Sequence, residues 1–122
     1  MLLHIVARGR IGRSPEGELV DRYLKRIAWP TRVTELPDQG GREPDRPAAQ
    51  SRRILLDEKG EVLGSADFAA RLGRWRDDGV RETRFLIGAA DGFDDATRAG
   101  ADLLLGFGAL TWPHLLARAM LA

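Results

Sequence analysis

Short apolar runs that alternate with amphipathic segments are the feature that most limits how this chain can fold. Residues 2–7, 54–56 and 103–105 are compact apolar runs, and residues 83–87 end in Phe-Leu-Ile. Runs of this length, bounded by glycine and charged residues, are typical of buried strands. The segments between them have helical spacing or turn composition. This alternation predicts an α/β fold with a mainly parallel sheet covered by helices on both faces.

Two segments have the spacing of amphipathic helices. Ser14 and Pro15 supply an N-cap and a first helical proline, and apolar residues then recur on one face until Trp29-Pro30. The second helix is expected to start at a Ser65 cap, to stop at Asp78-Gly79, and to carry three residues inward: Phe68, Leu72 and Trp75.

The remaining segments are less regular. Residues 32–37 alternate like a half-buried strand, whereas residues 38–53 are rich in Gly, Pro and Arg and have little to bury. A third helix is expected over residues 94–101. Pro113 is expected to open a last helix that runs to the chain end without a stop signal and carries an apolar stripe of Leu115, Leu116, Met120 and Leu121.

Composition narrows the class of protein. A chain of 122 residues fits one domain, residues 1–122, and the absence of cysteine suits a reducing compartment such as the cytoplasm. No apolar stretch reaches the ~18 residues of a membrane span. The net charge is only +1, but residues 1–56 carry +4 and residues 57–122 carry −3. The N-terminal half is therefore the better candidate to meet phosphate, although a mixed solvated surface explains the difference about as well.

Three loops follow predicted strands and could line one pocket. They are residues 56–60 (Leu-Asp-Glu-Lys-Gly), residues 86–92 and residues 106–114. Ligands of open α/β sheets bind at the carboxyl ends of strands, and glycine lets the backbone approach a ligand closely. Asp57 is interpreted as a turn former rather than a base. Each glycine-rich loop taken alone is more often a turn than a site.

The loops do not have the patterns of phosphate-binding sequences. Neither Gly-x-x-x-x-Gly-Lys-Ser/Thr nor a full Gly-x-Gly-x-x-Gly is present, which argues against a nucleoside triphosphate. Backbone amides and carbonyls can instead recognise an adenine edge without charged side chains. A cofactor without phosphates suits such a pocket.

The sequences of these loops resemble those of the RlmH family of SPOUT-class methyltransferases. Residues 87–92 (Ile-Gly-Ala-Ala-Asp-Gly) resemble the family's Ile-Gly-Gly-x-x-Gly loop, and residues 109–114 (Ala-Leu-Thr-Trp-Pro-His) resemble its Met/Leu-Thr-x-Pro-His segment. The Leu-Asp-Glu-x-Gly segment at residues 56–60 and the Val-x-x-Gly segment at residues 6–9 also agree with the family in order and position. Four ordered matches extend over most of the chain.

The resemblance implies a SPOUT-type parallel sheet with a C-terminal trefoil knot, a homodimer, and S-adenosyl-L-methionine as cofactor. The implied reaction is methylation of N3 of a pseudouridine in 23S ribosomal RNA on the ribosome, in the cytoplasm. Ala89 stands where the family usually has a second glycine. The implied cofactor contacts are Leu56, Gly88, Ala89, Phe107, Gly108, Ala109, Leu110, Thr111 and Trp112.

His114 and Arg118 lie one helical turn apart at the start of the expected last helix. They are either a structural pair or the catalytic pair. In the second interpretation Arg118 stabilises substrate phosphate or developing charge, and His114 supports the loop. Arg8 and Arg13 are candidate RNA contacts. Methyl transfer by in-line displacement requires no metal.

The chain also departs from the family pattern. It lacks the family's C-terminal Glu-Gln-x-Tyr-Arg-Ala-x and His-Pro-Tyr-His segments, and it lacks the helix expected between the strands at 32–37 and 54–56. Two alternatives therefore stay open. One is a non-catalytic α/β module that binds RNA or the ribosome, and the other is a flavodoxin-like regulatory domain that binds nucleotides.

Overall fold

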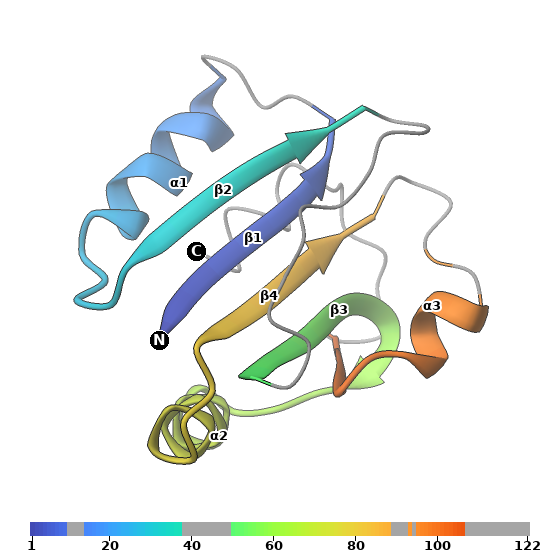
Figure 1. Ribbon diagram of the computed structural model, residues 1–122. Helices are drawn as coiled ribbons and strands as arrows, with labels where there is room; N and C mark the ends of the chain where they lie inside the picture. Colours follow the sequence, from blue (N-terminus) through green and yellow to red (C-terminus); the bar gives the residue numbers. More distant parts are fainter. Residues whose placement is uncertain (10–13, 38–49, 89–92, 94, 107–122) are drawn as a thin grey trace.

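The computed structural model describes residues 1–9, 14–37, 50–88, 93 and 95–106. Its elements alternate along the chain, as the apolar runs predicted (Figure 1). They are β1 (Leu2–Arg8), α1 (Pro15–Leu24), β2 (Thr31–Leu36), β3 (Ser51–Glu61), α2 (Ser65–Asp77), β4 (Glu82–Ile87), α3 (Asp95–Ala99) and β5 (Leu103–Leu105).

The described strands form a five-stranded parallel sheet. Their order is β2-β1-β4-β3-β5, and each of the four neighbouring pairs is parallel. The predicted parallel sheet is therefore confirmed. In a parallel sheet all carboxyl ends lie at one edge, so β4, β3 and β5 end beside one another there.

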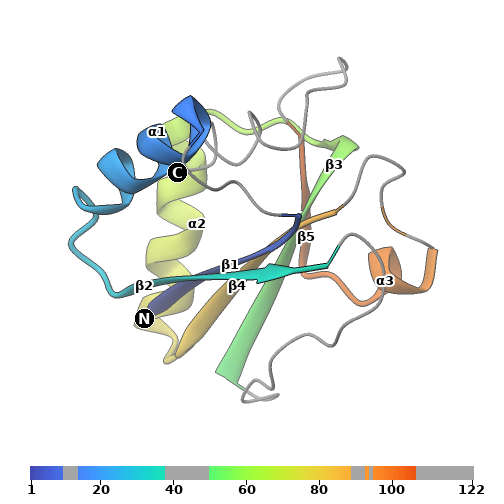
Figure 2. The same ribbon diagram turned by 90° about the horizontal axis from the view of Figure 1, so that it is seen from above.

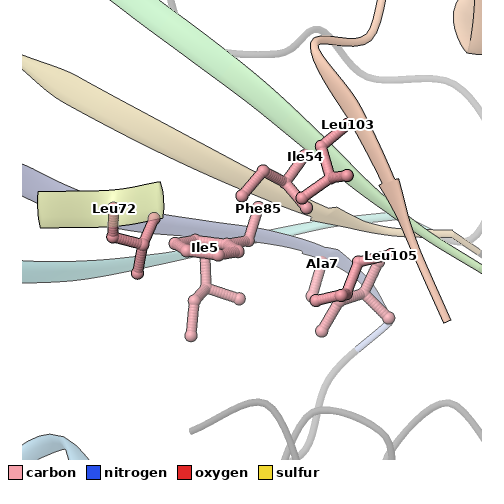
Figure 3. Packing of buried hydrophobic residues seen from close by; sticks show 8 residues of the cluster. Ile5, Ala7, Ile54, Leu72, Phe85, Leu103 and Leu105 are labelled. Atoms are coloured by element: carbon pink, nitrogen blue, oxygen red, sulfur yellow. The ribbon is translucent and has the colours of Figure 1, made fainter. Parts of the chain in front are cut away.

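Both faces of the sheet are packed. Figure 2 shows α1 and α2 on one face and α3 on the other. The larger core, beneath α2, consists of Ile5, Ala7, Ile54, Leu72, Phe85, Ile87, Leu103 and Leu105 (Figure 3). On the opposite face Val6, Leu55 and Leu86 pack against Phe93 and Ala101. Adjacent strand residues point to opposite faces, so a continuous apolar run such as Leu55 beside Ile54 supplies both cores.

Helix α1 begins as predicted but ends earlier. The Ser14 hydroxyl accepts a hydrogen bond from the Gly17 amide at 3.1 Å, which confirms the N-cap. The helix stops at Leu24, and the Ile27 amide then donates to the Leu24 carbonyl in a tighter turn. The chain must extend before Pro30 to enter β2, and this requirement ends the helix before the apolar pattern does.

Helix α2 confirms the expected end and corrects the expected start. Gly64 is the N-cap and makes no side-chain capping bond, so Ser65 is the first helical residue rather than the cap. The helix ends at Asp77, before Gly79 with its φ of +89°. Leu72 is buried, and Phe68 meets Phe85 edge to face at 6.2 Å between ring centroids.

Strand β3 is longer than the apolar run from Ile54 to Leu56. It starts at Ser51, so Arg52 and Arg53 belong to the strand and not to the preceding irregular segment. The reason is tertiary, because Ser51 to Leu55 pair with Glu82 to Leu86 of β4. Most of that irregular segment, residues 38–49, lies outside the described residues. So do the expected last helix with its apolar stripe and the chain from residue 107 on which a knot would depend.

The sheet also buries a polar cluster near the amino ends of its central strands. His4 Nδ1 lies 2.9 Å from Glu82 Oε1, and Arg84 Nε donates to the same oxygen at 2.9 Å. The Thr34 hydroxyl lies 2.7 Å from His4 Nε2. A proton on Nδ1 lets His4 donate to Glu82 and accept from Thr34, which satisfies both ring nitrogens. The cluster joins β1, β2 and β4.

Loss of the Glu82 carboxylate should destabilise this cluster strongly. The side chains of His4 and Arg84 are 1% exposed, so Glu82→Ala leaves a buried cation without its partner and should lower the free energy of unfolding by about 3–5 kcal/mol. The matched control is Asp77→Ala, which removes an exposed partner of Arg76 and should cost less than about 1 kcal/mol. Urea denaturation followed by circular dichroism measures both. Equal losses would show that the cluster contributes no more than a surface ion pair.

Candidate cofactor site at the carboxyl edge of the sheet

Three of the loops singled out in the sequence begin at the same edge of the sheet. Gly88 follows β4, Gly106 follows β5, and Leu56 is the last β3 residue before the ladder becomes irregular. Since β3 lies between β4 and β5, these three positions are neighbours. The expectation that the loops share one edge is confirmed for their described parts.

Residues 57–60 form a bulge in β3 rather than the simple turn expected at the end of a strand. Leu56 and Glu61 both pair with Leu105, so the four residues between them leave the ladder. The Gly106 amide donates to the Glu61 carbonyl at 3.0 Å, which closes the bulge against β5. Figure 1 shows the distal part of β3 curving back on itself. Bulges of this kind redirect a strand beside functional sites.

Two glycines allow the backbones of the bulge and of β5 to touch. A Cβ placed on Gly60 would lie 2.6 Å from the Leu105 carbonyl carbon and 2.8 Å from the Gly106 nitrogen. A Cβ on Gly106 would lie 3.0 Å from the carbonyl oxygens of Asp57 and Gly60. Any side chain at Gly60 would force the two backbones apart. The Leu-Asp-Glu-x-Gly spacing contained this signal, but the sequence alone did not show what Gly60 approaches.

Gly88 leaves little free space beside it. A Cβ built there would lie 3.2–3.4 Å from atoms of the Phe93 ring. Phe93 packs against the core on the α3 face, so the ring can yield only by disturbing that packing. A branched side chain at Gly88 would therefore be crowded on the described side and would displace the loop backbone.

The Asp57 side chain does more than form a turn. It is only 3% exposed, and its Oδ2 accepts from Arg98 Nε of α3 at 2.6 Å. Asp57 opens a bulge within β3 rather than the expected turn. Its carboxylate is an ion-pair partner, and sequence reasoning missed this contact because Arg98 lies 41 residues further along the chain.

The other predicted residues divide into described and undescribed ones. Leu56 is half-buried and packs against the larger core. Arg8 donates from Nη1 to the Pro37 carbonyl at 3.0 Å. The expected contacts Ala89 and residues 107–112 lie outside the described residues, and so do His114, Arg118 and Arg13.

An apolar groove of about 420 Å³ lies elsewhere, between α1, α2 and the face of β1 and β4. Its lining includes Leu24, Trp29, Phe68 and Leu72, with Arg76 stacked over Trp29 at 5.1 Å. The lining residues come from α1, α2, the connection from α1 to β2, and the first and middle residues of the strands. This groove has few groups that could recognise a polar nucleoside. No described helix is long and apolar enough to cross a membrane.

A parallel α/β sheet with converging loops at its carboxyl edge, together with the family comparison, defines the class. The whole chain, residues 1–122, matches the family described as "Predicted SPOUT methyltransferase". The chain belongs to the SPOUT methyltransferases.

Its relatives carry a more specific name. It is 73% identical to the ribosomal RNA large subunit methyltransferase H of Rhizorhabdus wittichii and 67% identical to that of Novosphingobium aromaticivorans. Each alignment covers all of this chain and 86% of the relative. The protein of the same name from Paramagnetospirillum magneticum is 43% identical, with all of this chain and 88% of the relative covered.

The alignment lengths also bear on the internal segment that the sequence lacks relative to the family pattern. The alignments at 73% and 67% span 122 positions, as many as this chain has residues, whereas the alignment at 43% spans 134. The more distant relative therefore has internal residues that this chain and its two nearer relatives lack. The shorter sequence is a shared feature of these nearer relatives.

Replacing Gly60 should test the close backbone contact at this edge. In Gly60→Ala the new methyl must push Leu105 and Gly106 away, and we expect a loss of about 1–3 kcal/mol in the free energy of unfolding, as for overpacked positions. The matched control is Gly73→Ala in α2, where a Cβ meets nothing within 4 Å; it should stabilise the helix by about 0.5–1 kcal/mol. Thermal and urea denaturation measure both. Opposite signs are expected, and an unchanged Gly60→Ala stability would contradict the contact.

Proposed function

We propose that this chain transfers a methyl group from S-adenosyl-L-methionine to N3 of a pseudouridine in 23S ribosomal RNA. The observation that carries the proposal is the meeting of the Leu56, Gly88 and Gly106 loops at one sheet edge, since their sequences resemble the cofactor loops of this family. The names of the relatives, which specify large-subunit ribosomal RNA, support the same substrate class.

The described residues suit a cofactor without phosphates. Gly60 and Gly106 keep backbone groups at the edge, and the charge of Asp57 is offset by Arg98. Backbone amides and carbonyls can recognise an adenine edge and a ribose. We assign the cofactor to Leu56, Gly88, Ala89, Phe107, Gly108, Ala109, Leu110, Thr111 and Trp112.

The proposed methyl transfer depends mainly on the alignment of the cofactor methyl with the acceptor nitrogen. The bound cofactor would supply an electrophilic methyl on a sulfonium. As the new N–C bond forms at N3, the S–CH3 bond would break with release of S-adenosylhomocysteine, and the N3 proton would leave to solvent. Aligning the two reactants and excluding water can provide much of the acceleration. In this proposal Arg118 stabilises the negative charge that develops on the deprotonating base, and His114 orients the loop that precedes it.

The proposed partners are the ribosome with its 23S RNA and a second copy of the chain, in the cytoplasm. The basic excess of residues 1–56 would favour contact with RNA phosphates. The apolar groove between α1 and α2 is a surface that an interface would cover, and the sequence predicts a second apolar stripe from Leu115, Leu116, Met120 and Leu121. Sedimentation at a protein concentration of tens of micromolar should give a dimer, because a dissociation constant in that range corresponds to a binding free energy of ~7 kcal/mol. A monomer at this concentration would argue against the dimer.

Binding of the demethylated cofactor, S-adenosylhomocysteine, should depend on Gly88. In Gly88→Val the branched side chain meets the Phe93 ring and displaces the loop, so binding measured by calorimetry should be lost. Ala70→Val, at an exposed position of α2 outside the groove, is the control and should bind like the original protein. Circular dichroism shows that both are folded. Equal affinity of a folded Gly88→Val protein would remove Gly88 from the site.

Methyl transfer to intact ribosomes separates an enzyme from a binding module. With tritiated cofactor, Arg118→Ala should lower kcat by about a hundredfold, the usual effect of removing one charge-stabilising donor, without changing cofactor affinity. Arg118→Lys should recover part of the rate. Ribosome binding without any transfer by the unaltered chain would favour the non-catalytic module, and an unchanged rate in Arg118→Ala would exclude the proposed role of Arg118.

A further inference from the structure

The Asp57–Arg98 ion pair lies directly behind the proposed cofactor edge. Asp57 follows Leu56 at the start of the β3 bulge, and Arg98 lies in the last turn of α3. The Oδ2 to Nε distance is 2.6 Å, and the Asp57 side chain is 3% exposed against 32% for Arg98. A short, largely buried contact of this kind holds its two elements in one relative position.

The pair joins two of the three loops, and the backbone joins the third. Helix α3 is the first element after the loop that starts at Gly88, so Arg98 ties the end of that connection to the bulge of β3. The Glu61 carbonyl, at the other end of the bulge, accepts from Gly106 after β5. The bulge is thus held on one side by a side chain and on the other by backbone contact.

The pair is attached where the ladder between β3 and β5 becomes irregular. Leu56 and Glu61 both pair with Leu105, and residues 57–60 form the bulge between them. Asp57 is the first residue of this bulge, so its ion pair restrains the backbone at the point where the regular ladder stops. The carboxylate is also engaged with α3, which offsets its charge beside a pocket suited to backbone recognition.

We propose that Asp57 and Arg98 are positioning residues for cofactor binding. They hold the β3 bulge and α3 in the relative position that the nucleoside site requires, and they touch neither the reacting methyl nor the acceptor base. The inference rests on the proposed function, because it concerns the affinity of that same site.

The test compares two arginine–carboxylate pairs, one partly buried and one fully buried. Arg98→Met removes the partly buried pair at the carboxyl edge, and Arg84→Met removes the fully buried pair with Glu82 at the amino ends of the strands. Calorimetry with S-adenosylhomocysteine is run at a temperature where circular dichroism shows both proteins folded. Arg98→Met should bind roughly tenfold or more weakly, as expected when supporting contacts let a site loosen, whereas Arg84→Met should keep the original affinity.

Two further measurements separate positioning from general stability. Amide hydrogen exchange without ligand should speed up at residues 56–61 and 105–106 in Arg98→Met but not in Arg84→Met. The double variant Asp57→Asn with Arg98→Met should bind no more weakly than the weaker single variant, because the two residues act as a unit. If Arg98→Met fails to fold, Arg98→Lys keeps the charge, loses the Nε contact, and should show the same changes at smaller size.

The outcomes are distinct. Failure of the unaltered protein to bind the ligand would overturn the proposed function and this inference with it. Binding by the unaltered protein with equal affinity in Arg98→Met, or equal weakening in Arg84→Met, would overturn the positioning role alone. Additive losses in the double variant would also count against it.

Discussion

The burial of β4 on both faces is the constraint on which the rest of this structure depends. All six of its residues are buried, and it pairs with β1 on one side and β3 on the other. A strand in this position needs a complete hydrogen-bond ladder on both edges and a packed layer on both faces. Phe85 and Ile87 supply the core beneath α2, and Leu86 supplies the opposite core. Burying Glu82 and Arg84 in the same strand is tolerated because the Glu82 carboxylate accepts a hydrogen bond from Arg84 and is also bonded to His4.

The carboxyl edge of the sheet is built by a different kind of contact. Here the fold depends on backbone meeting backbone at Gly60 and Gly106, and on one ion pair from Asp57 to α3. These contacts join the β3 bulge to β5 and to α3. A fixed geometry at this edge of the sheet would favour methyl transfer, because alignment of the reactants rather than acid–base chemistry provides much of the acceleration. The fold and the proposed reaction therefore both require these residues to keep a fixed geometry.

Local patterns predicted the parts of the fold whose physics is local. The Ser14 cap, the stop at Gly79 and the strand from Leu103 to Leu105 were all expected from short-range rules, and the structure confirms them. The errors fall where tertiary pairing decides. Arg52 and Arg53 have no apolar pattern, yet they form a strand because β4 offers them a ladder. Helix α1 stops before its apolar spacing does, because the chain must turn into β2.

The sequence by itself determined the class of fold, the order of strands and helices along the chain, and the three loops that resemble a known cofactor site. These features follow from apolar runs, turn residues and loop sequences, each of which is contained in a few consecutive residues. Only the tertiary structure decided that β3 lies between β4 and β5, that Gly60 touches Gly106, and that Asp57 pairs with Arg98. These contacts join residues about forty positions apart, and their energies depend on distances that no local pattern encodes.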